Sequence, residues 1–518
     1  MTRKGNSETS ILQRRLLQAA ATAAVAFLAA TALTFLPAGA QEAKRGGTVT
    51  LVTPQGFPGL DPVLTSLGNG DNLHSLLWNG LTRYDEQNNV LPDLAVGWDV
   101  IDTHTIVFHL RKGVKFHNGR EVLPADVIAS IMRVLDPETA SPYRDSLKSI
   151  ATIDQVDDVT IQINLSSPDV TIPASLAPIK IQPPENFADA NQNPIGTGPF
   201  KFVKYVSGDR LTLARFEDYW DQPKPYPDEF IVQIAKDPIT AYNAFKSGQF
   251  DLIWQMDFSI VEEVKNNPDM TLIVPQVTST SLMFGVDASQ PPFDNKIARQ
   301  ALMYATDKQA IIEAAYFGIG YPSPTNSNLV ENHWAYHPNL PPREYDIEKA
   351  RALFREAGIE EGYTLTFNGY DRQDVRTQAE ILERSLNEVG IKLEIVLTDI
   401  PGWRAVFEKP WPNTVSFKGQ VRGWDPSLLL AGLQCNDEQA LISYCNEEVD
   451  ALMEKGRATF DQEERKAIYY KIQEILYDEV PWIVNIHYTP DHAAFSYIKG
   501  FYVDGRGQLH LDGVWTEK

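Results

Sequence analysis

Alternating apolar and polar positions predict several half-buried β-strands along the chain. Between residues 105 and 110, Ile106, Phe108 and Leu110 fall on one face, and the same period of two recurs in 160–165. Apolar or β-rich runs bounded by turn residues predict further strands. These runs cover residues 48–52, 201–205, 211–216, 251–254, 279–286, 392–397 and 482–487.

A spacing of three to four residues between apolar positions predicts helices elsewhere. Residues 124–135 begin with Pro124, which suits a first helical position, and Val127 and Ile131 share one face. Further helices are expected over residues 74–81, 239–246, 297–306, 308–316, 347–357, 375–389, 447–459 and 462–478. Helices and strands mix without strict alternation, and no long linker separates them. The pattern indicates an α/β chain that crosses between lobes more than once.

The first 40 residues have the pattern of a cleaved export signal. Four basic residues precede an apolar run over 19–36, and Ala38-Gly39-Ala40 offers a small-x-small cleavage site. An uncleaved anchor is the alternative, because 18 apolar residues nearly span a bilayer. Arg14-Arg15 resembles a twin-arginine signal, so both general and twin-arginine export stay open. We expect a periplasmic protein without stable membrane insertion.

Length and charge limit the possible classes of protein. A chain of 518 residues is long enough for two to four domains. Its formal net charge is −22, and removal of the first 40 residues leaves 42 basic and 67 acidic residues, a net of −25. Such an excess of acid argues against nucleic acid and anionic membrane surfaces as partners.

The two cysteines, Cys435 and Cys445, are ten residues apart. In an oxidising compartment we expect them to form a disulfide. Two sulfurs with no histidine nearby make a poor metal site, and the spacing excludes a Cys-x-x-Cys redox motif. We expect neither a metal nor a cofactor.

Enzyme motifs are missing from the sequence. There is no Gly-Lys dipeptide for a phosphate loop, no His-Glu-x-x-His, and no Gly-x-Ser-x-Gly elbow. Carboxylates that meet only in space, as in a glycosidase, leave no such pattern, so a secreted hydrolase stays as an alternative. We expect a binding protein rather than an enzyme.

Residues 416–426 concentrate the tools of small-molecule recognition. Arg422, Trp424 and Asp425 bring a guanidinium, an indole and a carboxylate together, and Gly419 and Gly423 let other groups approach the backbone. The structural alternative is a loop that closes a strand, with Trp424 in the core and Arg422 solvated.

A set of motifs in a fixed order extends over nearly the whole chain after residue 40. Together they resemble the extracytoplasmic solute-binding proteins of family 5, the peptide- and nickel-binding components of ABC importers. The motifs lie at residues 91–98, 105–110, 111–119, 125–127, 196–200, 218–220, 247–251, 292–293, 299–305, 446–452 and 481.

The resemblance implies a two-lobed periplasmic binding protein fold, type II in its large three-domain variant, with a hinge between the lobes. Lobe 1 would comprise residues 41–293 and 489–518, with domain I at about 41–85, 197–293 and 489–518 and domain II at about 86–196. Lobe 2, domain III, would comprise 294–488. A small-molecule ligand would close the lobes of a monomer, and an ABC permease would read the closed shape.

In peptide-binding members, an Asp before a trailing Asp-Pro takes the ligand's amino group, and an Arg at a helix start takes its carboxylate. Here Asp425-Pro426 matches the trailing pair and the amine-binding Asp has no clear counterpart, whereas Arg376 matches the helix-start Arg. Arg422 is an additional basic group beside Trp424. We therefore expect a pocket for an anionic group, with Arg376 and Arg422 as its partners.

Four further residues complete the predicted pocket. Trp424 and Phe57 would supply stacking surface, and Ser279 and Ser281, on a hinge strand, would donate hydrogen bonds. Asp425 is a candidate with a structural role as its alternative. Arg376 could instead pair with Glu380, and Phe57 could pack its own loop.

The predicted ligand is peptide-like or an anionic conjugate. The alternatives are a non-peptide solute, such as an opine-like conjugate, a modified sugar or a metal chelate. A sensory adaptor that presents its ligand to a membrane receptor is a further alternative.

Overall fold

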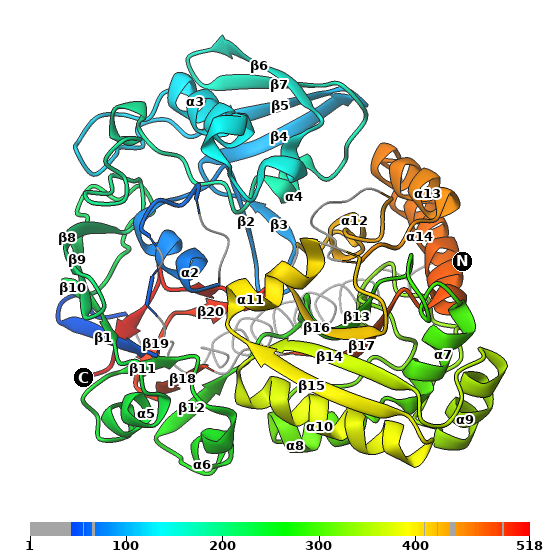
Figure 1. Ribbon diagram of the computed structural model, residues 1–518. Helices are drawn as coiled ribbons and strands as arrows, with labels where there is room; N and C mark the ends of the chain where they lie inside the picture. The colour runs from blue at the N-terminus through cyan, green and yellow to red at the C-terminus, as the bar shows by residue number, and fades with distance from the viewer. Residues whose placement is uncertain are drawn as a thin grey trace, which may run out of the picture. The chain divides into compact units, whose positions relative to one another are not determined.

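Three larger β-sheets and three two-stranded ribbons organise the described part of the chain (Figure 1). The computed structural model describes residues 43–54, 56–57, 59–64, 68–408, 410–421, 423–435, 442–488 and 492–518. The predicted export signal and Arg422 therefore lie outside the described residues. No helix in these ranges is long and apolar enough to cross a membrane.

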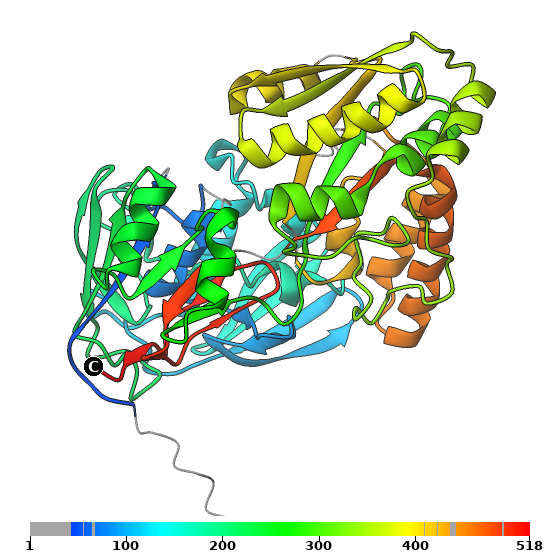
Figure 2. The ribbon, with the colours of Figure 1, turned by 90° about the horizontal axis from the view of Figure 1, so that it is seen from below.

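The seven-stranded sheet combines distant parts of the chain. Its strands, in spatial order, are β12 (Met270–Ile273), β18 (His492–Phe495), β11 (Leu252–Trp254), β1 (Thr48–Thr53), β10 (Glu229–Ile234), β9 (Arg210–Arg215) and β8 (Phe200–Val206). Strand β1 runs parallel to β10 and β11, whereas β18 runs antiparallel to β11 and β12. Figures 1 and 2 show red β18 beside green β11 and β12.

Helices cover both faces of this sheet. Successive side chains of a strand point to opposite faces, so neighbouring residues of β1 pack against different helices. Leu51 packs with apolar residues of α2 (Gly68–Leu77), whereas Val52 packs with residues of α5 (Pro238–Lys246) and α6 (Val261–Lys265). The end of α2 also explains Gly196 and Gly198 of the motif at 196–200. A Cβ on Gly198 would lie 2.5 Å from the carbonyl carbon of Leu77. A Cβ on Gly196 would lie 1.9 Å from the carbonyl oxygen of Leu77, so only glycine fits.

The four-stranded sheet is antiparallel, in the order β4 (Ala95–Asp102), β5 (Thr105–Leu110), β7 (Thr160–Leu165) and β6 (Ile150–Asp157). The alternation predicted for β5 is confirmed, because Ile106 and Phe108 are fully buried. Helix α3 (Pro124–Leu135) buries Val127 and Ile131 in the same core, so the apolar face predicted for this helix is confirmed.

The five-stranded sheet has the order β15 (Lys392–Thr398), β14 (Thr364–Tyr370), β16 (Thr414–Val421), β13 (Thr280–Val286) and β17 (Trp482–His487). Leu282 and Phe284 face one hydrophobic cluster and Met283 faces another, so β13 is buried on both sides. The first cluster contains residues of α7 (Lys296–Ala305), α8 (Lys308–Tyr316), α9 (Ile347–Glu356) and α10 (Gln373–Glu388). The second contains residues of α12 (Pro426–Leu429), α13 (Glu447–Ala458) and α14 (Gln462–Glu479).

Short elements complete the described fold. The ribbons pair β2 (Thr82–Tyr84) with β3 (Val90–Pro92), β19 (Ile498–Lys499) with β22 (Trp515–Thr516), and β20 (Tyr502–Val503) with β21 (Leu509–His510). The short helices are α4 (Ile172–Ser175) and α11 (Ile400–Ala405), with 3-10 turns at Pro137–Thr139, Arg144–Leu147, Pro184–Asn186, Phe258–Ile260 and Val406–Glu408.

Two connections join the seven-stranded and five-stranded sheets. Residues 274–279 lead from β12 to β13, and the chain returns from β17 through Tyr488 to β18. The connections are bonded to each other: the Thr278 hydroxyl donates to the Tyr488 carbonyl (2.6 Å), and the Tyr488 amide donates to the Thr280 carbonyl (3.1 Å). We call these paired segments, residues 274–280 and 487–488, the hinge.

One predicted element has the wrong bounds. The helix expected over residues 74–81 is α2, which runs from Gly68 to Leu77. The stretch that begins at Ser416 starts within β16, a strand up to Val421 that the sequence pattern did not predict. Its β-structure is set by pairing with β13 and β14 on either side, and that pairing is a long-range property.

Candidate functional site

The carboxyl ends of four strands and the start of the fifth lie at one edge of the five-stranded sheet. Strands β14, β15 and β16 are parallel, so their carboxyl ends lie at the same edge. Antiparallel β13 starts there, because Thr280 pairs with Val421, and β17 ends there, because Ser281 pairs with His487. Ligands of open α/β sheets bind outside the carboxyl ends of the strands.

The seven-stranded sheet has a corresponding edge. Strands β1, β10 and β11 are parallel and end at Thr53, Ile234 and Trp254. Strand β12 ends at Ile273, which pairs with His492 at the start of β18. Both hinge connections therefore run from one edge to the other. We call the two the hinge-facing edges, and the space beside them is the candidate ligand site.

Trp424 follows β16 at the edge of the five-stranded sheet. Its half-buried indole lies 4.5 Å from the His333 ring and packs against Tyr84, Ala174 and Ala177. Tyr84 belongs to the β2–β3 ribbon, and a Cβ on Gly423 would approach its hydroxyl within 2.8 Å. Trp424 thus bridges two parts of the chain far apart in sequence, and it neither sits wholly in the core nor projects freely.

Asp425 has a structural role. Its carboxylate caps α12 by accepting from the Ser427 amide (2.9 Å), and both of its oxygens lie 2.9 Å from Nη2 of Arg465. The side chains of this pair are only 12% and 8% exposed. Burial acts to lower the pKa of Arg465, but Asp425 and Tyr469 outweigh it and raise that pKa. The structural alternative for Asp425 is therefore favoured.

Arg376 pairs with Asp371 (2.7 Å) and not with Glu380, and its side chain is 43% exposed. A second arginine, Arg372, occupies the N-cap of α10 and was missed by the sequence analysis. The predicted helix began at residue 375, two residues after the observed start, so Arg372 fell outside it.

Arg372 is a half-exposed cation at the sheet edge. Its Nη2 lies 2.6 Å from Asp374, and its guanidinium lies 5.0 Å from the Tyr370 ring and 5.9 Å from the Phe417 ring. Burial acts to lower its pKa, but the hydrogen bonds and charge of Asp374 raise it above the usual value. Because 48% of the side chain is exposed, it can bind an additional anion.

The other predicted residues are occupied within the protein. Phe57 is 8% exposed and packs against Tyr205 with the ring centroids 6.1 Å apart, which favours the packing alternative. The Ser279 hydroxyl donates to the Gly505 carbonyl (3.2 Å), and the Ser281 hydroxyl lies 3.2 Å from Nδ1 of His487. Burial lowers the pKa of His487 to about 3, so its imidazole is neutral. Ser279 thus belongs to the hinge, and Ser281 contacts the hinge through His487.

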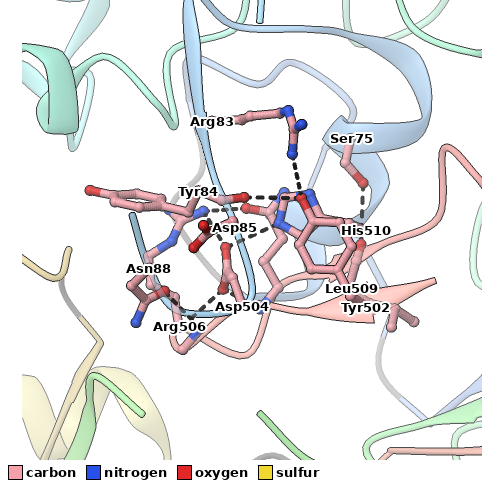
Figure 3. Close-up of polar contacts among 12 residues, drawn as sticks. Ser75, Arg83, Tyr84, Asp85, Asn88, Tyr502, Asp504, Arg506, Leu509 and His510 are labelled. Carbon is pink, nitrogen blue, oxygen red and sulfur yellow. Dashed lines mark hydrogen bonds and ion pairs between the residues drawn. The ribbon is translucent and has the colours of Figure 1, made fainter. Parts of the chain in front are cut away.

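A C-terminal loop, residues 504–508, joins the hinge to the β2–β3 ribbon. Figure 3 shows Asp504 and Arg506 of this loop near Tyr84 and Asn88. Gly505 accepts from Ser279 through its carbonyl and donates its amide to Asn88 (2.8 Å). Arg506 lies 4.8 Å from the Tyr84 ring and 3.1 Å from Asp504. Burial would raise the pKa of Asp504, but Arg506 and His510 lower it to about 2. No sequence motif points to this loop, because Ser279 and Asn88 lie hundreds of residues away from it.

A cavity of about 850 Å³ lies beside α12. Segments before β6 and after β7 line one side, and residues of α12 and α13 line the other. The Val170 amide donates to the Arg457 carbonyl (2.9 Å) between these two sides. Its volume falls in the range of small-molecule sites. Ser427 and Leu428 line it, so it lies next to the segment that carries Trp424.

The predicted disulfide between Cys435 and Cys445 is confirmed. Within the ranges that the structure describes, no cluster of three or more His, Cys, Asp or Glu side chains is placed to hold a metal ion.

Comparison with known proteins confirms the family resemblance. The model of the bacterial extracellular solute-binding proteins, family 5 middle, matches residues 89–427. Heme-binding protein A of Haemophilus influenzae is 29% identical over 502 residues, which cover 89% of this chain and 91% of that protein. Di/tripeptide-binding protein 1 of Pseudomonas aeruginosa is 30% identical over 481 residues, which cover 84% and 88%.

The fold agrees with solved structures of this kind. The structure of PBP AgaA from A. tumefaciens R10 in complex with agropinic acid matches with a TM-score of 0.80 and 26% identity, covering 91% of this chain and 99% of that one. The predicted two-lobed α/β fold of a periplasmic binding protein is thereby confirmed. The chain belongs to the bacterial extracellular solute-binding proteins of family 5.

Proposed function

We propose that this protein is the periplasmic substrate-binding component of an ABC importer. It is exported by a cleaved signal peptide, binds one small solute as a monomer, and delivers it to the membrane permease. Lobe 1 corresponds to residues 41–293 and 489–518, and lobe 2 to residues 294–488. The observation that carries the proposal is that both hinge connections run between the carboxyl edges of two sheets.

The ligand that we propose is peptide-like or an anionic conjugate. Arg372 and Arg376 are half-exposed at one hinge-facing edge, which favours a carboxylate or another oxyanion. Asp425 is already neutralised by Arg465, so it offers no countercharge to a ligand amine. The names of similar proteins give heme, di- and tripeptides and agropinic acid as their ligands, and the last of these is an acid.

Binding in this proposal involves no covalent chemistry. The solute contacts both hinge-facing edges, so it has a higher affinity for the closed arrangement and shifts the population toward it. Trp424 provides an aromatic surface for the solute. The backbone of the hinge changes conformation when the lobes close. Arg422, which lies outside the described residues, stays a further predicted cation.

The test begins with the protein as purified. Gentle denaturation followed by mass spectrometry identifies a released solute, and a thermal-shift screen of short peptides and opine-type acids identifies ligands that stabilise the fold. A ligand at about a hundred times its dissociation constant adds roughly 2.7 kcal/mol to the free energy of unfolding.

Trp424→Ala should weaken that stabilisation, whereas Trp98→Ala should not. Trp98 is also half-buried, but it packs on Phe108 within the four-stranded sheet and so controls for the loss of an indole. Turnover of the solute, or equal ligand affinity in the Trp424→Ala and wild-type proteins, would contradict the proposal.

A further inference from the structure

A second cavity, of about 240 Å³, lies away from the hinge-facing edges. It is built from the end of α2, from β2 and β3, from the turn after β5, from residues 219–221 and from the C-terminal segment. Arg83 on β2 lines it. The neighbouring Tyr84 packs toward Trp424, on the opposite face of the strand. The two sites are therefore separate.

Three sequence motifs meet in this cavity. Asp93 belongs to the motif at 91–98, Arg111 to the motif at 111–119 and Trp220 to the motif at 218–220, and all three residues line it. A tight turn or a packed core does not require such charged residues to converge on one space. The solute site proposed at the hinge-facing edges does not use Asp93, Arg111 or Trp220.

Arg111 is the central group of this cavity. Its guanidinium lies 4.1 Å from the centre of the Trp220 ring, and Nη2 reaches the Asp93 carbonyl only at 3.4 Å. Its Nε is shielded from solvent and has no acceptor among the described residues. An enclosed donor on a charged group is costly without a partner. The planar guanidinium is suited to the two oxygens of a carboxylate or a phosphate.

The charges around Arg111 favour an anion. The lining contains three cations, Arg83, Arg111 and Lys180, and three carboxylates, Asp93, Asp221 and Asp512. A fourth cation, Lys224, bonds Asp512 (2.7 Å) and Asp221 (3.0 Å). The group thus carries one excess positive charge within a chain of formal net charge −22. Burial also raises the pKa of Asp93 to about 6, which disfavours its negative form.

The volume limits the size of the occupant. A water molecule takes about 30 Å³ in the liquid, so the cavity corresponds to about eight waters. That is enough for phosphate, sulfate or a small carboxylic acid, and it is less than the usual pocket for a drug-sized ligand.

We propose that this cavity binds a small oxyanion through Arg111, with Lys180 and Arg83 completing its positive side, at a site independent of the transported solute. The anion binds the guanidinium of Arg111, which lies in the lining of the cavity. It also links β2, the turn after β5 and the segment that carries Lys180, so its binding stabilises the fold.

The test uses the full mature chain at constant ionic strength. Inorganic phosphate, sulfate and acetate are titrated separately, with isothermal calorimetry and thermal shift as readouts. We expect saturable binding with one site per chain for at least one anion. A preference for phosphate or sulfate would identify a tetrahedral occupant, and a preference for acetate would identify a carboxylate.

Arg111→Ala should lower the affinity at least tenfold, and Arg111→Lys should restore only part of it, because lysine lacks the planar fork. Lys180→Gln, a change of a different element, should also weaken binding if Arg111→Ala folds poorly. Arg210→Ala, at an exposed arginine of β9, is the matched control and should bind as wild type.

Two results would overturn the site. One is the absence of saturable binding for all three anions, and the other is equal affinity in wild type and in well-folded Arg111→Ala and Lys180→Gln. Arg372→Ala should leave the anion affinity unchanged. That variant separates this inference from the proposed function, since either can fail without the other.

Discussion

Two arginine–carboxylate pairs near the same edge of the five-stranded sheet have different surroundings. Arg465 and Asp425 are 8% and 12% exposed and also engage Gly456 and Ser427. Arg372 is 48% exposed, although its partner Asp374 is 6% exposed. Both pairs use the same chemistry. The first pair is almost fully buried, and the second leaves about half of its arginine side chain exposed.

The difference shows that exposure, rather than residue type, decides which group is available to a ligand. A buried pair cannot lose either member without leaving a charge in a medium of low dielectric constant. A half-exposed cation can exchange water for a ligand carboxylate at little cost to the fold. We therefore assign Arg465–Asp425 to stability and Arg372 to the proposed site.

The largest effect should come from Asp425→Ala. It leaves the Arg465 guanidinium buried without its countercharge, and we expect the free energy of unfolding to fall by about 3–5 kcal/mol. Urea denaturation measures the change. Asp371→Ala, at the exposed partner of Arg376, is the control and should change stability by about 0.5 kcal/mol or less. Equal free energies of unfolding in the two variants would contradict the assignment of Arg465–Asp425 to stability.

The next effect concerns the disulfide next to the segment that carries both Trp424 and Asp425. Replacing Cys435 and Cys445 with serine opens a loop of ten residues, and we expect a loss of about 2–3 kcal/mol. Chemical denaturation of the double variant, and of reduced wild type, gives two independent values. If neither differs from the oxidised protein, the crosslink does not support this segment.

A third pair, Arg506–Asp504, is buried like Arg465–Asp425 and gives a prediction about pH. The folded pKa of Asp504 is about 2, below its unfolded value of 3.8. The contribution of the Asp504 carboxylate to the free energy of unfolding is therefore complete above about pH 4 and is lost as the pH falls through 2. The shift corresponds to roughly 2 kcal/mol. The stability gap between wild type and Asp504→Asn should narrow by that amount between pH 5 and pH 2, and a constant gap would refute this assignment.

The smallest effect should come from Arg376→Ala. Its ion pair with Asp371 is exposed on both sides, so the free energy of unfolding should change by about 0.5 kcal/mol or less. Thermal denaturation without ligand measures it. A loss as large as that of Asp425→Ala would place Arg376 with the structural pairs.

The sequence predicted elements well where the pattern is local. Helix α8 and strand β17 have the predicted bounds, and the ordered motifs identified the family. Roles that depend on distant partners were not predictable. Asp425 meets Arg465 forty residues away, and Phe57 meets Tyr205, a residue that no local pattern links to it. The two-residue error at the start of α10 directed attention to Arg376 instead of Arg372.

The most direct test of the central claim is the affinity of Arg372→Ala for the solute that the protein retains, measured by calorimetry against wild type. Arg351→Ala, at an exposed ion pair of α9, is the matched control. We expect Arg372→Ala to bind about 10- to 100-fold more weakly, because a charge-assisted hydrogen bond is lost, and Arg351→Ala to bind as wild type. Unchanged affinity in a folded Arg372→Ala protein would contradict a solute site at this edge.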